Sequence, residues 1–120
     1  MAGTPDHPIT ISPAPQRVRV RFAGRTVADT VRALSLQEAS YPPVLYIPRE
    51  DVEMSLLVRS NHKTRCPYKG EASYYSIKAD GGSAENAIWT YEQPFADVAE
   101  IAGHMAFYPS RVDGIEETPV

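Results

Sequence analysis

The sequence predicts a mainly β protein, a small single domain of antiparallel sheets with one or two short helices. Three observations carry this prediction. Apolar and polar residues alternate with the two-residue period of half-buried strands. The candidate strands are short and bounded by glycine, proline and aspartate turn residues. Finally, strands do not alternate regularly with long helical patterns, as they do in a parallel α/β domain. The 120 residues fit one domain.

The chain begins with a proline-rich segment. Each proline removes an amide donor and fixes a backbone angle, so we expect residues 1–16 to form a disordered arm. Residues 17–22 then alternate three arginines with three apolar residues, which predicts a strand with the arginines facing water.

The middle of the chain continues in short segments. Residues 26–29 and 31–36 are predicted to form a pair of short β segments, and residues 44–47 a compact strand between prolines. Pro48 follows, with two acids close behind it. Proline at a first helical position and acids near the positive end predict a single helical turn.

The strongest hairpin signal lies in the second half. Residues 55–59 have β character, and residues 74–79 and 87–91 are the next two strand candidates. The intervening Asp80-Gly81-Gly82-Ser83 segment is typical of a turn, so these two strands are predicted to form a hairpin.

The remaining segments complete the predicted domain. Residues 97–102, followed by Gly103, fit a short helix with a glycine cap, and residues 105–108 fit a last strand. The acidic tail of residues 113–120 is expected to fray. The β domain proper is therefore predicted to span residues 17–112.

Composition narrows the class of function. The formal net charge is −3, so the chain lacks the basic excess that binding to DNA or RNA exploits, and no nucleic-acid partner is expected. The apolar runs are too short to span a bilayer, and the first residues do not form a signal peptide. A single cysteine permits no internal disulfide. A cytoplasmic protein without a membrane partner is expected.

Residues 64–75 are the most chemically dense stretch. They contain the only cysteine, two cations, an acid and three tyrosines, and they are predicted to form a turn that leads into a strand. Polar groups that converge on one cleft usually indicate a ligand.

Five segments together resemble the family known as domain of unknown function 427 (DUF427), over residues 18–112. They are Tyr41-Pro42-Pro43, Tyr46 to Val52, Thr64-Arg65-Cys66-Pro67-Tyr68-Lys69-Gly70, Asn86 to Tyr91 and Ile101 to Tyr108. The resemblance implies a small β-tent or Mss4-like architecture. The name of the family also associates it with nucleotidyl transfer.

The residues do not support that activity. Nucleotidyl transfer uses paired acids on a rigid element to hold a divalent metal. The adjacent acids here, Glu50-Asp51 and Glu116-Glu117, lie beside a helical turn and in the tail. Glycine-rich phosphate loops and the paired CxxC motifs of Mss4-like zinc sites do not occur either. No metal and no cofactor are expected.

Four residues are candidates for catalysis. Nearby cations favour the thiolate of Cys66, Lys69 can stabilise developing negative charge, and Glu71 and His104 can move protons. For Cys66 the alternative is a small buried hydrophobe, and for His104 a structural hydrogen-bonding role.

A second set of residues is predicted to bind a ligand around one common hollow. Arg49 and Lys69 suit an anion, and the aromatic residues suit a planar molecule. We therefore expect a module that binds a small anionic or aromatic metabolite. The alternatives are an enzyme that uses Cys66 or a carboxylate, and a protein-interaction module. The predicted ligand-binding residues are Tyr46, Arg49, Lys69, Tyr75, Trp89, Tyr91, Glu92 and Tyr108.

Overall fold

The computed structural model describes residues 2–120 and folds them into three antiparallel sheets. This architecture confirms the predicted mainly β class. The first sheet has the order β1-β2-β5-β6, with β1 at Ala2–Thr4, β2 at His7–Pro13, β5 at Leu34–Glu38 and β6 at Val44–Tyr46.

The second sheet is formed largely by two long hairpins and has the order β10-β9-β8-β7. Its strands are β7 at Leu57–Cys66, β8 at Gly70–Ala79, β9 at Gly82–Thr90 and β10 at Met105–Phe107. The third sheet has the order β11-β3-β4, with β3 at Arg17–Phe22, β4 at Arg25–Thr30 and β11 at Gly114–Thr118.

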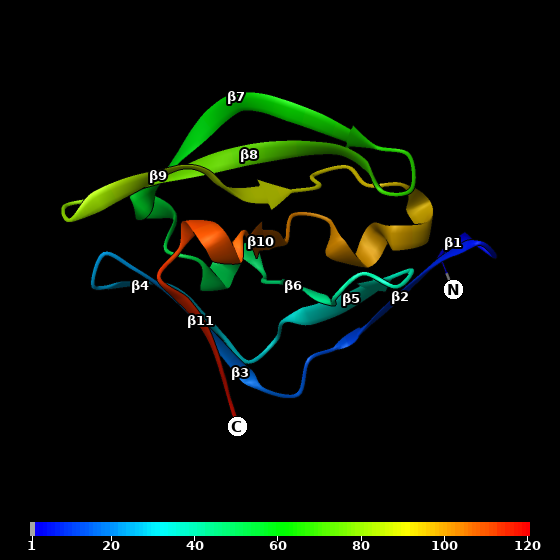
Figure 1. Cartoon of the computed structure of the whole chain (residues 1–120), viewed down its shortest axis with the longest axis horizontal. Coiled ribbons are helices and arrows are strands. Elements are labelled where there is room, and N and C mark those ends of the chain that lie inside the picture. Colours follow the sequence, from blue (N-terminus) through cyan, green and yellow to red (C-terminus); the bar gives the residue numbers. More distant parts are fainter. Residues whose placement is uncertain (1) are drawn as a thin grey trace.

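Two isolated backbone bridges help to connect the sheets. Ile47, just after β6, exchanges backbone hydrogen bonds of 2.8 and 2.7 Å with Met105 of β10. Val52, which lies in a connecting segment outside the strands, forms an isolated antiparallel bridge to Ala28 of β4. In Figure 1, β7, β8 and β9 lie on one side and β2 and β3 on the other, with β6 and β10 between them. The molecule is therefore layered.

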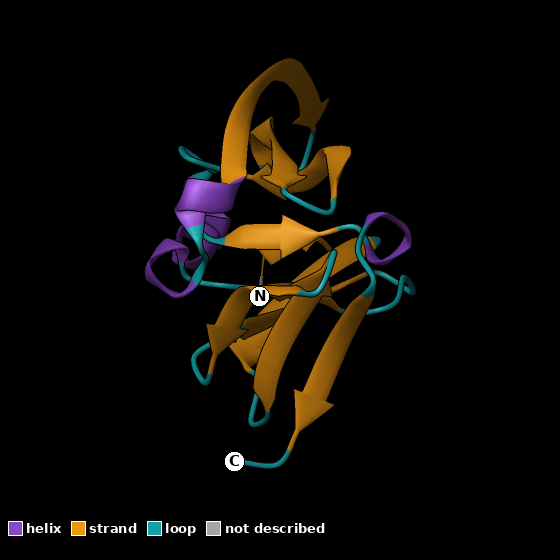
Figure 2. Ribbon diagram, turned by 90° about the vertical axis from the view of Figure 1, so that its left-hand side faces the viewer, coloured by secondary structure: helices purple, strands orange, loops and turns teal. Residues whose placement is uncertain are grey.

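The helical segments are short 3-10 turns, namely η1 at Arg49–Asp51, η2 at Met54–Leu56, η3 at Ala96–Ile101 and η4 at Pro109–Arg111. They lie beside the strands in Figure 2. The helical turn after Pro48 and the helix ending before Gly103 are confirmed. Gly103 has φ +71°, a left-handed conformation that glycine adopts without strain. Among residues 2–120, no helix is long and apolar enough to cross a membrane.

The core divides into two clusters of buried side chains. One contains Val18 and Val20 of β3, with Ile88 and Phe107 from the second sheet. The other contains Ile9, Tyr46, Tyr74 and Tyr91, together with Ile101 of η3. Burial of these apolar side chains is the main stabilising contribution to the fold.

The predicted strands and hairpin correspond closely to observed elements. Residues 17–22 form β3, and the hairpin through Asp80 and Gly81 joins β8 to β9. Residues 44–47 and 105–108 contain β6 and β10. The β character predicted for residues 55–59 begins only at Leu57, because η2 precedes it.

The prediction of a disordered arm over residues 1–16 is wrong for the described part. β2 pairs with β5 from Ile9↔Glu38 to Pro13↔Leu34. Ile9 is fully buried, so tertiary burial stabilises this strand despite its prolines. Pro8 uses only its carbonyl, which accepts a 2.8 Å hydrogen bond from the amide of Ala39.

The prediction of a fraying acidic tail is also wrong. Residues 114–118 form β11 and pair with β3, with Glu116 opposite Arg19 and Glu117 opposite Val18. Ile115 packs against the core. The strand forms because Glu116 meets the basic face of a distant partner strand and Ile115 meets its apolar face. The ordered domain therefore extends beyond the predicted limits of residues 17–112 at both ends.

Candidate functional site

The second sheet separates the predicted site residues onto its two faces. In β8, Tyr74 is paired with Trp89, and the predicted site residue Tyr75 is paired with Ile88. Successive strand residues point to opposite faces. Consistently, Tyr74 packs in the cluster that contains Tyr91, whereas Tyr75 packs in the other cluster. The predicted ligand-binding residues therefore do not surround one hollow.

Lys69 lies on the Tyr74 side and is 7% exposed. Its ammonium donates a hydrogen bond to Glu38 of β5, and the same carboxylate lies 2.7 Å from His7 Nε2. Burial alone would raise the pKa of Glu38, but the hydrogen bonds from Lys69 and His7 outweigh it and lower this pKa. Lys69 is thus not a solvated surface cation, and this ion pair ties the turn between β7 and β8 to β5.

Aromatic residues occupy the same side. The Trp89 indole donates a 3.2 Å hydrogen bond to the Tyr46 hydroxyl, and its ring centroid lies 4.4 Å from that of Tyr108. Burial raises the pKa of Tyr46 and of Tyr91. Burial, aided by the hydroxyl of Tyr74, also raises the pKa of Tyr108 to about 12. These phenols are therefore neutral hydrogen-bonding groups at physiological pH.

Arg49, Tyr75 and Glu92 lie on the opposite face. Both Arg49 and Arg59 donate 3.2 Å hydrogen bonds to the Tyr75 hydroxyl. Arg59 also holds Glu92 through two hydrogen bonds of 3.0 and 2.7 Å. These bonds lower the pKa of Glu92, so its carboxylate is a weak base. Among the ion pairs formed by residues 2–120, Glu92 pairs with Arg59 and Glu71 with Lys63.

A polar pocket of about 510 Å³ adjoins this group, lined by Lys63, Glu71, Ser73, Glu92 and Gln93. Ser73 is buried, and its hydroxyl accepts a 3.1 Å hydrogen bond from the Lys63 ammonium. The pocket therefore contains two of the predicted carboxylates, together with a cation and a hydroxyl that were not predicted.

The other catalytic candidates lie apart from this pocket. Cys66, at the end of β7, is half-buried and packs against the cluster that contains Tyr46, with its thiol free. His104 is half-buried, and its Nδ1 lies 3.2 Å from the carbonyl oxygen of Ala102. The structure therefore does not pair this histidine with the thiol. Residues 2–120 contain no group of three or more histidine, cysteine or acidic side chains placed to hold a metal ion.

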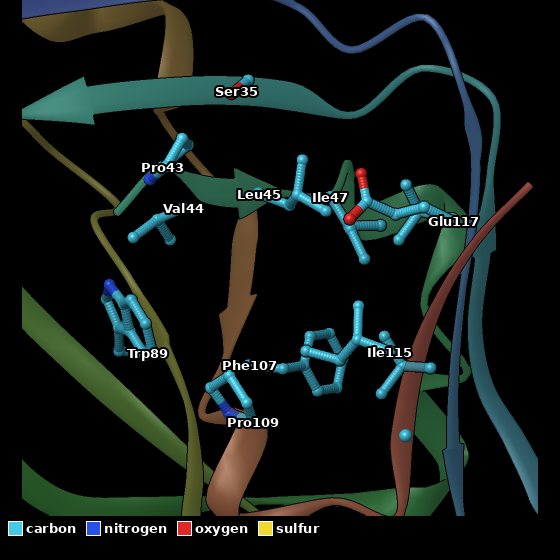
Figure 3. A pocket seen from close by; sticks show the side chains of 13 residues that line it. Ser35, Pro43, Val44, Leu45, Ile47, Trp89, Phe107, Pro109, Ile115 and Glu117 are labelled. Carbon is cyan, nitrogen blue, oxygen red and sulfur yellow. The ribbon is translucent and has the colours of Figure 1, made fainter. Parts of the chain in front are cut away.

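An apolar cleft of about 670 Å³ lies between the third sheet and the strands β5, β6, β9 and β10. Figure 3 shows its side chains arranged around an open centre, with Trp89 at one side. Among the predicted ligand-binding residues only Trp89 lines it. The lining consists of Val18, Val20, Ser35, Pro43, Val44, Leu45, Ile47, Trp89, Phe107, Pro109, Gly114, Ile115 and Glu117.

The sequence contained only part of the signal for this cleft. Alternation in β3 placed Val18 and Val20 on one apolar face, but the apolar face of a strand usually packs against other core side chains and does not line an open cleft. Ile115 and Glu117 were assigned to a fraying tail, so their contribution was missed. Whether a sheet face is fully covered depends on the position of distant strands, and that is not encoded in a local pattern.

Comparison with known proteins places the chain in a family without assigning it an activity. No curated protein matches the chain. A family model does match, over residues 10–118, and this confirms the resemblance carried by the Tyr-Pro-Pro and Cys-Pro-Tyr-Lys-Gly segments. The matched range covers most of the chain and includes the second half of β2 and all of β11, the strands that the sequence alone did not predict. The chain belongs to the family described as Domain of unknown function (DUF427).

Proposed function

We propose that this protein binds an apolar or aromatic small molecule in the apolar cleft. The single observation that carries the proposal is the cleft itself. Its volume of about 670 Å³ falls in the range of small-molecule sites, roughly 300–1,000 Å³. Its lining is predominantly aliphatic and aromatic, with a few polar groups, which is also the usual composition of such sites.

The walls of the cleft are held in place before any ligand arrives. Val18, Val20 and Ile47 are at most 1% exposed, and Phe107 is 4% exposed. Each of them is part of the packed core, so ligand binding would order few additional side chains. A preformed site loses little conformational entropy on binding, which favours affinity.

Trp89 supplies an oriented aromatic surface at one side of the cleft. The hydrogen bond from its indole to Tyr46 and its packing against Tyr108 hold the ring. Arg49 and Lys69 are absent from the lining. The proposal therefore keeps the aromatic part of the ligand predicted from sequence and omits the anionic part.

Trp89 is the only tryptophan in the chain, so its fluorescence reports on this cleft directly. We expect the neutral apolar probe phenylnaphthylamine to quench Trp89 and to raise the thermal midpoint, because a ligand bound only by the native state stabilises it. Ile115→Lys should weaken binding about tenfold by placing a charge beside the probe.

Ile11→Lys is the matched control, because Ile11 is also half-buried but packs against the other cluster. It should leave probe affinity unchanged. If the probe fails to quench Trp89, or if both lysine variants weaken binding equally, the cleft is not a ligand site. A role as a protein-interaction module would then be the better hypothesis for the function of this protein.

The polar pocket favours a second candidate function, a small-molecule enzyme on the opposite face of the second sheet. Its supporting observation is that Lys63, Ser73 and Glu71 line one pocket, with the Lys63 ammonium 3.1 Å from the Ser73 hydroxyl. Glu71 would act as the base, because Arg59 holds Glu92 through two short hydrogen bonds, whereas the contact of Glu71 with the Lys63 ammonium is longer, at 3.7 Å. Glu71→Gln should then abolish turnover of a small substrate and leave thermal stability and probe binding unchanged.

A further inference from the structure

Glu117 is the one charged side chain among the residues that line the apolar cleft. Strand register explains its position. Glu117 lies opposite Val18, which is fully buried, whereas Glu116 lies opposite Arg19. Because successive strand residues point to opposite faces, Glu117 shares the inward face with Ile115, and Glu116 points away from the cleft.

Within residues 2–120, this carboxylate has no basic side chain as an ion-pair partner. The cleft lining contains no lysine, arginine or histidine, and among the ion pairs formed by residues 2–120 none involves Glu117. The outward-facing acid on the same strand, Glu116, instead lies across from an arginine. Glu117 thus gives the cleft a local negative charge.

The charged and aromatic parts of the cleft are separated. In Figure 3, Trp89 lies on the left and the Glu117 carboxylate right of centre, above Ile115, with Phe107 nearer the middle of the view. A ligand that fills the cleft would therefore place one end against the indole and the other near the carboxylate. An anionic group at that second end would be repelled by Glu117, whereas a cationic group would be attracted.

We propose that the ligand of the cleft is an organic cation, an amine with an apolar or aromatic body. This inference rests on the proposed function and specifies the chemical class of the ligand. The apolar walls contact the apolar or aromatic body of the ligand, and the Glu117 carboxylate favours ligands that carry a positive charge. The carboxylate is exposed, so the selectivity it provides is moderate and depends on ionic strength.

Three matched probes with the same body test the inference: phenylbutylamine, phenylbutanol and phenylbutyrate. Their dissociation constants are measured by quenching of Trp89 at low salt. We expect the amine to bind about fivefold more tightly than the alcohol, the scale of a partly exposed ion pair, and the carboxylate to bind most weakly. Added salt should reduce the preference for the amine.

Two neighbouring variants separate charge selection from a general effect of the strand. Glu117→Gln should bring the amine and the alcohol to equal affinity. Glu116→Gln removes the same charge from the outward face of β11 and should keep the preference. Circular dichroism checks that both variants remain folded.

The outcomes distinguish the two proposals. If phenylbutanol binds but the amine has no advantage, or if Glu117→Gln leaves the advantage intact, the inference about charge is overturned while the cleft remains a ligand site. If none of the three probes quenches Trp89 in the wild-type protein, the proposed function fails, and the inference that rests on it fails as well.

Discussion

The buried ion pair between Lys69 and Glu38 gives the sharpest test of the structure. The Lys69 side chain is 9% exposed and the Glu38 side chain 18% exposed. Removing one partner of a buried pair leaves an uncompensated charge and typically costs about 3–5 kcal/mol. Because Glu38 retains some solvent contact, we expect Glu38→Gln to cost about 3 kcal/mol, at the lower end of that range.

Replacing the lysine of the pair should destabilise the protein less than replacing the glutamate. Lys69→Met keeps much of the side-chain volume and leaves Glu38 with His7 and solvent, so we expect a loss of about 1–2 kcal/mol. The double variant, Glu38→Gln with Lys69→Met, contains no unpaired buried ammonium, so its free energy of unfolding should fall by only about 2 kcal/mol. This is well below the ~4–5 kcal/mol obtained by adding the single effects. The shortfall measures the coupling between the two side chains.

Urea unfolding followed by fluorescence gives the free energies of unfolding, and thermal melts provide a second reading. A loss of about 3 kcal/mol should lower the midpoint by roughly 10 °C for a domain of this size. Lys78→Met is the control, because this lysine of β8 is exposed and its loss should change stability by less than ~0.5 kcal/mol. If Glu38→Gln costs as little as this control and the two single effects add, Lys69 is hydrated and the reasoning is wrong.

Three further predictions follow from the same structure. The pKa of Glu38 is lower in the folded state than in the unfolded chain, so the unfolded chain binds the proton first as the pH falls. The free energy of unfolding should therefore decrease as the pH drops from about 5 to about 3. Glu38→Gln should flatten this part of a plot of thermal midpoint against pH, and an unchanged slope would count against the ion pair. Arg59→Ala should move the pKa of Glu92 up toward its ordinary value, as followed by carboxyl NMR titration, and an unmoved titration would contradict the bidentate contact. Deleting residues 114–120 removes the pairing of β11 with β3 and the packing of the half-buried Ile115, and should destabilise the domain by roughly 2 kcal/mol. An unchanged urea unfolding curve would instead indicate that these residues are frayed.

Local patterns were sufficient for the central elements. The alternation of residues 17–22, the Asp-Gly-Gly turn after residue 79 and the proline before η1 each encode their own geometry in adjacent residues. Such signals depend on the steric preferences of the backbone and on which side of a strand is apolar. The family resemblance likewise needed only short motifs at the correct spacing.

The arm and the tail show the limit of local reasoning. Prolines in β2 and acids in β11 argue against strands when they are read in isolation, and both segments are nevertheless paired. The β11 strand pairs with a partner that lies at the other end of the sequence. Its stability comes from matching a face that the local pattern does not reveal.

The predicted site residues are divided between two faces for a related reason. Residues chosen for their chemistry were expected to face one hollow, but Tyr75 packs in one core cluster, whereas Tyr46 and Tyr91 pack in the other. The amino-acid sequence by itself determined the β class, the main strands and turns, and the family. Tertiary structure alone decided that Lys69 would be buried against Glu38 and that Val18, Phe107 and Glu117 would line one cleft. These contacts join segments far apart in the chain, and their energies exist only once the sheets have packed together.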